Sequence, residues 1–182
     1  MEIKLKRLLI VKIDHTGDYI IFRNFIEIIR KSAKFEHFHI TILCNEHLKD
    51  LLTFLDGDYV DRILTLNLNK YLFNSWYTHR KEQELLSESY NVILQPTFSR
   101  LLKIDKLINK MVANEKISFE SFDWDMILQD REESRKYYQK LISIGDKKIF
   151  EFERYKLSFE KLLKEIDPDK YIELGFNDFE EA

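Results

Sequence analysis

Strand-length apolar runs alternate with amphipathic helical segments along this 182-residue chain, and this alternation constrains its fold most strongly. The clearest run is RLLIVKI at residues 7–13, which is typical of a strand that is buried on both faces. A helix follows it, because apolar residues between Ile21 and Ala33 recur with a period of about 3.6. Further strands are expected at 39–44, 60–66, 90–95 and 115–119.

Helices are expected between and after these strands, at residues 45–55, 78–89, 100–112, 130–142 and 150–166. The order predicts an α/β fold, a Rossmann-like parallel sheet with helices on both faces and right-handed crossovers. In such sheets, ligands bind at the carboxyl ends of the strands. The candidate site is therefore expected in the loops at 14–18, 45–46, 67–70 and 96–100.

Composition excludes several classes of protein. A hydrophobic fraction of 45% excludes a disordered chain, and a net charge of −3 argues against a dedicated nucleic-acid binder. A single cysteine, Cys44, excludes a disulfide framework, and the five histidines are not spaced like metal ligands, so no metal site is expected. The N-terminal segment lacks the pattern of a secretion signal, and no stretch is apolar enough for a membrane span. The expected location is cytoplasmic.

The loop Asp14-His15-Thr16-Gly17-Asp18 stands out, because it joins the first strand to its helix. It contains one glycine and no G-K-[ST], so neither a dinucleotide fingerprint nor a nucleotide-triphosphate loop is supported. Gly17 is expected to supply an unusual backbone angle. A helix N-terminus stabilises a carboxylate, so Asp18 is either a plain helix-capping acid or a functional group.

The segment LLIVKIDHTGDYIIFRNFIEIIRKSAK resembles the opening of glycosyltransferase family 9, the heptosyltransferase family of lipopolysaccharide assembly. Members begin with a strand of the form I-L-I-V-[RK], here Leu9 to Lys12, and then a turn ending in G-D, here Thr16 to Asp18. Later family segments are matched in the same order by ITILCNEHLKDLL, YVDRILTLN, YNVILQPTFSR, FDWDMI, YYQKLI and FEFERYKLSFEKLL.

The resemblance implies a GT-B glycosyltransferase, in which two Rossmann-like domains face one cleft without requiring a metal. The first domain binds the acceptor, and the second binds the nucleotide-sugar donor. By motif position, Asp18 would be the general base that takes the proton of the attacking acceptor hydroxyl, with inversion at the anomeric carbon. His15, Thr16, Gly17 and Arg100 are assigned to acceptor binding.

The resemblance also predicts how the chain is divided. Residues 1–166 would form the acceptor-binding domain, and residues 167–182 a C-terminal tail or the start of an interdomain linker. No later β-α-β series follows, so the chain is expected to be the acceptor half, inactive alone because both reactants must be held in one geometry. No cofactor is expected; a nucleotide-diphosphate sugar such as ADP-heptose would bind only with the donor domain.

The expected partners are a glycan or lipopolysaccharide acceptor and a donor domain supplied in trans. No nucleic acid is expected, and membrane contact would be at most peripheral, at the inner membrane. The alternative is a non-catalytic, stand-alone Rossmann-like binding module. The enzyme hypothesis predicts a cleft above residues 14–18 and an apolar face for the second domain, whereas the module predicts a polar surface on every side. A flavodoxin-like or response-regulator module is disfavoured, because no phosphate loop or acidic cluster with a suitable lysine is present.

Several further side chains are open to both a structural and a functional interpretation. Near the loops these are Lys12, Arg23, Thr97 and Ser99, where Ser99 is equally suited to cap a helix. A set of four aromatic residues could stack on sugars, form a docking patch or be buried. The set comprises Tyr71, Phe73, Trp76 and Tyr77.

Overall fold

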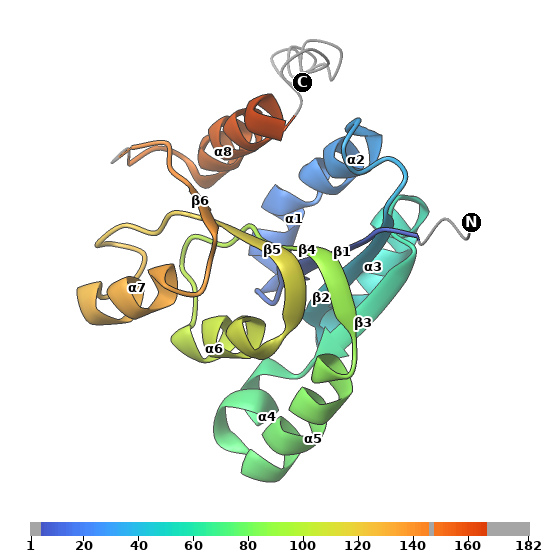
Figure 1. Ribbon diagram of the computed structural model, residues 1–182, viewed down its shortest axis with the longest axis vertical. Coiled ribbons are helices and arrows are strands. Elements are labelled where there is room, and N and C mark those ends of the chain that lie inside the picture. Colours follow the sequence, from blue (N-terminus) through green and yellow to red (C-terminus); the bar gives the residue numbers. More distant parts are fainter. Residues whose placement is uncertain (1–4, 146–147, 167–182) are drawn as a thin grey trace.

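The computed structural model describes residues 5–145 and 148–166, which form one parallel six-stranded sheet (Figure 1). The strand order is β3-β2-β1-β4-β5-β6, and every neighbouring pair is parallel. The strands are β1 (Arg7–Lys12), β2 (His39–Asn45), β3 (Arg62–Leu66), β4 (Ser89–Gln95), β5 (Val112–Phe119) and β6 (Lys140–Ile142). The predicted α/β, Rossmann-like fold class is confirmed.

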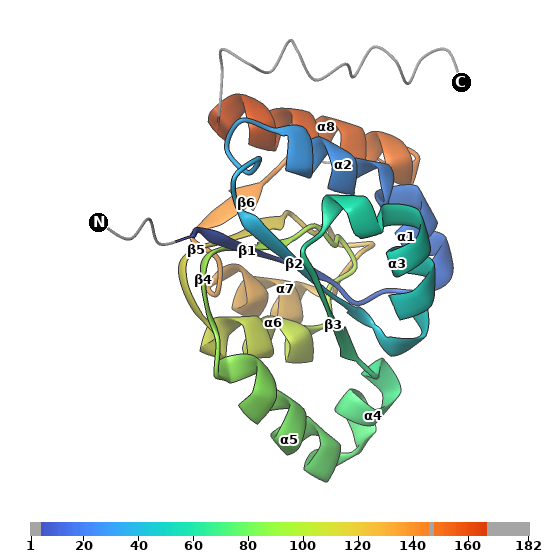
Figure 2. The same ribbon diagram turned by 90° about the vertical axis from the view of Figure 1, so that its right-hand side faces the viewer.

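Helices cover both faces of the sheet, as Figures 1 and 2 show. One layer contains α1 (Thr16–Phe22), α2 (Asn24–Lys31), α3 (Lys49–Asp56) and α8 (Glu151–Ile166). The other layer contains α4 (Leu68–Phe73), α5 (Ser75–Leu86), α6 (Leu102–Lys110) and α7 (Leu128–Arg135). Two short 3₁₀ turns, η1 (Glu46–Leu48) and η2 (Gly57–Tyr59), flank α3. None of the helices in the described part of the chain has the length and apolar character of a membrane span.

The position of β1 between two helical layers explains why residues 8–11 are all apolar. Leu8 and Ile10 belong to the hydrophobic core beneath α1, α2 and α8. Leu9 and Val11 belong to the separate core beneath α6. Since successive side chains of a strand point to opposite faces, a strand between two helical layers needs apolar residues at every position.

Helix α8 is held against the sheet by packed aromatic rings. The rings of Phe159 and Phe25 stack with centroids 4.8 Å apart, and Phe159 meets Phe119 edge-on at 4.9 Å. Tyr155, one turn earlier, is fully buried. This packing fixes α8 so that its first residue, Glu151, reaches the carboxyl edge of the sheet, where it lines a pocket.

Several predicted elements differ from the structure. Helix α4 lies in a segment with no predicted helix, α5 spans Ser75–Leu86 rather than 78–89, and β5 begins at Val112 rather than at residue 115. The segment 130–142 is not one helix: α7 ends at Arg135, and Lys140–Ile142 forms β6 alongside β5. The apolar side chains of this segment are concentrated in its last six residues, so the charged first half forms the helix and the second half extends the sheet. The helix after β1 is also divided, at Arg23, into α1 and α2. The expected tail or linker at 167–182 lies outside the described residues.

Candidate functional site

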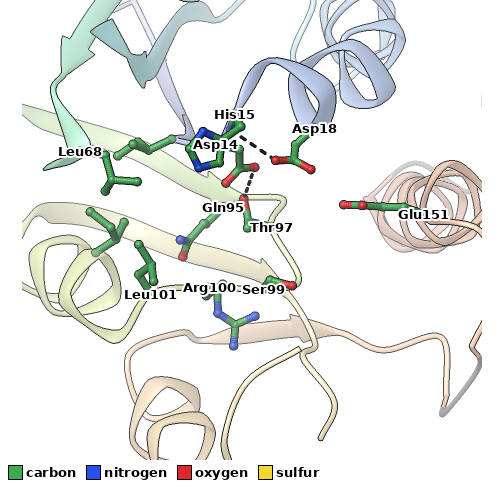
Figure 3. A pocket seen from close by; sticks show the side chains of 12 residues that line it. Asp14, His15, Asp18, Leu68, Gln95, Thr97, Ser99, Arg100, Leu101 and Glu151 are labelled. Carbon is green, nitrogen blue, oxygen red and sulfur yellow. Dashed lines mark hydrogen bonds between the residues drawn. The ribbon is translucent and has the colours of Figure 1, made fainter. Parts of the chain in front are cut away.

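A pocket of about 270 Å³ opens at the carboxyl edge of the sheet, beside the ends of the neighbouring strands β1 and β4 (Figure 3). The chain leaves β1 toward β2 on one side and later returns to β4 on the other, so the pocket lies at the topological switch point. The lining residues are Ile13, Asp14, His15, Asp18, Leu68, Gln95, Thr97, Ser99, Arg100, Leu101, Ile104 and Glu151. Three of the four loops expected at the site contribute to it, and the loop at 45–46 does not.

Asp18 occupies the third position of α1 and is half-buried on the pocket side of that helix. Its Oδ2 accepts the backbone N–H of His15 at 3.3 Å, so the carboxylate closes the start of the helix. Figure 3 shows the same group facing the cavity. The two interpretations of Asp18 are therefore compatible, because a capping carboxylate that lines a pocket still has a second oxygen to offer.

Of the other three residues assigned to this turn, His15 lines the pocket and Thr16 and Gly17 do not. His15 is exposed, lines the pocket and stacks on His47 with ring centroids 6.4 Å apart. Thr16 and Gly17 form the first turn of α1 and do not line the pocket. The expectation that Gly17 supplies an unusual backbone angle is wrong, because its φ is not positive and a Cβ there would meet nothing within 4 Å. Acceptor binding by His15, Thr16 and Gly17 stays a prediction.

Arg100 lines the pocket, but its guanidinium is held inside the protein. It donates to the carbonyl oxygen of Phe119, and its Nη2 donates to the hydroxyl of Ser134 at 3.1 Å. Its Nε lies 3.5 Å from a carboxylate oxygen of Asp105, and the group stacks over the ring of Tyr138. Arg100 thus links the loop after β4 to α7, and its proposed contact with an acceptor stays a prediction.

A buried lysine connects the floor of the pocket to α8. The ammonium of Lys12 donates to the carboxylate of Asp14 and, at 2.6 Å, to the hydroxyl of Tyr155. Asp14 also accepts a hydrogen bond from the hydroxyl of Thr97 at 3.3 Å. The interpretation of Lys12 as a structural residue is supported, because its charge is neutralised within this network. The sequence alone assigns no role to Asp14, although it lies in the loop that joins β1 to α1.

Glu151 is a pocket residue that sequence reasoning missed. It is contributed by the first turn of α8 and points across the cavity toward Asp18 (Figure 3). Burial raises the pKa of Glu151 above its ordinary value; the charge of Lys12 opposes this shift and the charge of Asp18 adds to it. Glu151 therefore holds its proton more tightly than an exposed glutamate does.

The lining combines polar groups with an apolar wall. Thr97 and Ser99 contribute hydroxyls, and Gln95 contributes a buried amide. Ser99 does not cap α6, whose N-cap is Leu101, so the capping alternative for Ser99 is wrong. Carboxylates, amides and hydroxyls together can accept and donate the hydrogen bonds of a polyhydroxy ligand. Among the described residues, no group of histidine, cysteine or acidic side chains is arranged to hold a metal ion.

Arg23 and the set of four aromatic residues lie outside this pocket. The guanidinium of Arg23 binds the carboxylate of Asp56 at 3.0 Å and the carbonyl of Leu55 at 3.2 Å. Tyr71 is buried, whereas Phe73 and Trp76 are exposed on the hairpin of α4 and α5.

The fold and the site together define a Rossmann-like α/β domain with a polar pocket at the switch point of its sheet. Solved structures share this fold. A glycosyltransferase family 9 protein from Veillonella parvula DSM 2008 superposes with a TM-score of 0.66 at 19% identity, over 89% of this chain and 43% of that one. The Escherichia coli heptosyltransferase WaaC with ADP gives 0.59 at 16% identity, over 86% of this chain and 46% of that one.

A third structure, MT0777, gives a TM-score of 0.51 at 12% identity and is covered over 97% of its length. No family model matches the sequence, and no curated protein matches it. The resemblance to glycosyltransferase family 9 is thus confirmed at the level of the fold, and the chain spans less than half the length of the first two structures.

Proposed function

We propose that this chain is the acceptor-binding half of a GT-B glycosyltransferase of the heptosyltransferase type. The complete enzyme would transfer a sugar, with inversion, from a nucleotide-diphosphate sugar such as ADP-heptose to lipopolysaccharide or another surface glycan. One observation supports this most: Asp18 faces a polar pocket at the end of β1, in a fold shared with a family 9 structure. The chain would act in the cytoplasm, next to the inner membrane.

In the proposed reaction, an acceptor sugar lies in the pocket with one hydroxyl beside Asp18. The carboxylate accepts the hydroxyl proton while the oxygen forms its bond to the anomeric carbon of the donor. The bond from that carbon to the nucleotide diphosphate breaks, and the diphosphate leaves with the electron pair. Because the His15 N–H holds Oδ2 of Asp18, the other carboxylate oxygen is free to act as the base. General-base assistance contributes about 10²–10⁴-fold in rate.

Glu151 would serve as a positioning residue in this reaction. Its carboxyl group faces the cavity and can hydrogen-bond one acceptor hydroxyl while Asp18 accepts from another. Two apolar residues are exposed here: Leu101, which lines the pocket, and Phe150, which precedes the pocket residue Glu151 in the sequence. Their exposure supports a covering second domain, which the enzyme hypothesis predicts.

The test combines this chain with a separately produced donor domain of a heptosyltransferase and measures transfer from ADP-heptose to a lipopolysaccharide core oligosaccharide. Asp18→Asn should lower the rate at least about 10²-fold. Asp50→Asn is the matched control, since Asp50 is also a first-turn acid, in α3, and does not line the pocket. Equal rates for the two variants would contradict the base assignment, and oligosaccharide binding without transfer would favour the stand-alone module.

A further inference from the structure

The hairpin of α4 and α5 carries two large aromatic side chains at its turn, and the protein leaves both in solvent. Phe73 is 85% exposed and Trp76 is 69% exposed, on either side of the turn at Asn74. Figures 1 and 2 both show this hairpin extending away from the sheet. We infer that the hairpin tip, residues 73–76, contacts an anionic lipid bilayer.

Hydrogen bonds within the hairpin hold its exposed tip in a defined conformation. The side chain of Asn67 caps α4 by accepting the N–H of Lys70, and that of Asn74 caps α5 by accepting the N–H of Tyr77, both at 3.0 Å. The hydroxyl of Thr78 donates to the carbonyl of Tyr71 at 2.6 Å, which ties the two helices together. The hairpin therefore presents its aromatic pair in a defined position, as a contact surface requires.

The charge around the tip complements an anionic membrane. Residues 67–81 contain no aspartate or glutamate, whereas Lys70 and Arg80 are exposed. The guanidinium of Arg80 lies 5.0 Å from the centre of the Trp76 ring, so a cation and an amphipathic ring share one position. Tryptophan favours the headgroup level of a bilayer, and each nearby cation adds attraction to anionic lipid.

The acidic side chains that border the hairpin are already engaged. Glu82 accepts hydrogen bonds from Tyr71 and Lys110, and Glu84 pairs with Lys81 at 2.8 Å. Glu46 accepts from the side chain of Asn67 at the base of α4. The exposed Lys70 and Arg80 thus keep the surroundings of the tip positively charged in the folded protein.

An equally exposed phenylalanine provides a contrast. Phe54 on α3 is also 85% exposed, but the exposed acids Asp50 and Asp58 lie in the same helix and in the turn that follows it. The membrane inference therefore depends on the combination of aromatic rings with unpaired positive charge, and Phe54 is the matched control for exposure alone.

The membrane contact would place the pocket near the bilayer, because the hairpin begins at the pocket. Leu68, the first residue of α4, lines the pocket, so the hairpin leads from the pocket to the bilayer surface. If the proposed function holds, the pocket would bind the glycan of a lipid-linked acceptor close to the membrane that anchors its lipid. The contact itself does not depend on sugar transfer.

The experiment is flotation of the chain with vesicles of phosphatidylcholine alone or mixed with phosphatidylglycerol, at low and high salt. Wild type should float with the mixed vesicles, and high salt should reduce this binding by screening. The double variant Phe73→Ser/Trp76→Ser should bind at least about tenfold more weakly. Phe54→Ser and Asp18→Asn should bind like wild type; the second result would separate this inference from the proposed function.

A second readout reports on Trp76 directly. In a Trp124→Phe background, Trp76 is the remaining tryptophan, and its emission should shift to the blue with mixed vesicles. Lys70→Glu/Arg80→Glu should remove that shift while leaving the thermal unfolding of the protein unchanged. Equal binding by wild type and the tip double variant would overturn the inference. A tip-dependent dimer in sedimentation, with no vesicle binding, would overturn it in favour of an interface between copies.

Discussion

The ion pair between Asp125 and Arg154 holds α8 against the loop that precedes α7, and replacing Asp125 with alanine tests how strongly it does so. The two side chains form two hydrogen bonds, at 2.9 and 2.7 Å. Both are almost fully buried, with 4% of the Asp125 side chain exposed. The guanidinium also lies 3.8 Å from the centre of the Phe98 ring. Removing the carboxylate would leave this guanidinium buried without its counter-charge.

Loss of one partner from a buried pair costs about 3–5 kcal/mol of unfolding free energy. For a chain of this size each kcal/mol corresponds to about 2–4 °C, so Asp125→Ala should lower the Tm by about 6–20 °C. The matched control lies two residues earlier. Asp123 pairs with Arg131 at 2.6 Å, but its side chain is 81% exposed. Asp123→Ala should therefore cost less than about 1 kcal/mol.

Urea unfolding followed by far-ultraviolet circular dichroism measures both free energies. The double variant Asp125→Ala/Arg154→Met should be more stable than Asp125→Ala, because the uncompensated charge is removed with its partner. Equal losses from Asp125→Ala and Asp123→Ala would refute the reasoning that burial sets the strength of the pair. A double variant less stable than Asp125→Ala would refute it as well.

Three further predictions concern the core and the titrating groups. Phe159→Ala should cost about 3–5 kcal/mol in the same assay, because the ring is fully buried among aromatics, whereas exposed Phe54→Ala should change stability by less than about 0.5 kcal/mol. Burial raises the pKa of Cys44 to about 12, so its thiol should resist a disulfide reagent at mildly alkaline pH until urea unfolds the chain. Burial opposes ionisation of Glu88, but hydrogen bonds from two arginines outweigh it and lower its pKa. A lowered pKa stabilises the fold above the ordinary value of about 4.5, so Glu88→Gln should be less stable than wild type at neutral pH, and urea titrations should converge as the pH falls through the lowered pKa.

The inner strands are predictable because a strand that is buried on both faces has a continuous apolar run in its sequence. β1, β2 and β4 each carry an apolar run that no helix period explains, and their predicted and observed bounds agree to within one residue. β6 has no such apolar run, since it is a three-residue edge strand that follows the charged helix α7 after four intervening residues. Its place depends on pairing with β5, which is a tertiary contact.

Dependence on tertiary contacts also decides which site residues can be predicted from the sequence. The loop at 14–18 was recognisable because its residues are adjacent in the sequence and follow a buried strand. Glu151 was not, because only the packing of α8 through Tyr155 and Phe159 brings it to the pocket. The internal bonds of Arg100 were equally hidden, since Phe119 and Ser134 come from later elements.

The central claim is that the pocket beside Asp18 binds a glycan acceptor, and NMR shift mapping of the ¹⁵N-labelled chain tests it most directly. A lipid-free lipopolysaccharide core oligosaccharide should shift the amides of residues 14–18 and 97–101 and of the first turn of α8, in a saturable manner. The amides of the hairpin tip should not move, because this ligand carries no lipid. Saturable shifts confined to other regions, or none in the pocket loops, would contradict the claim.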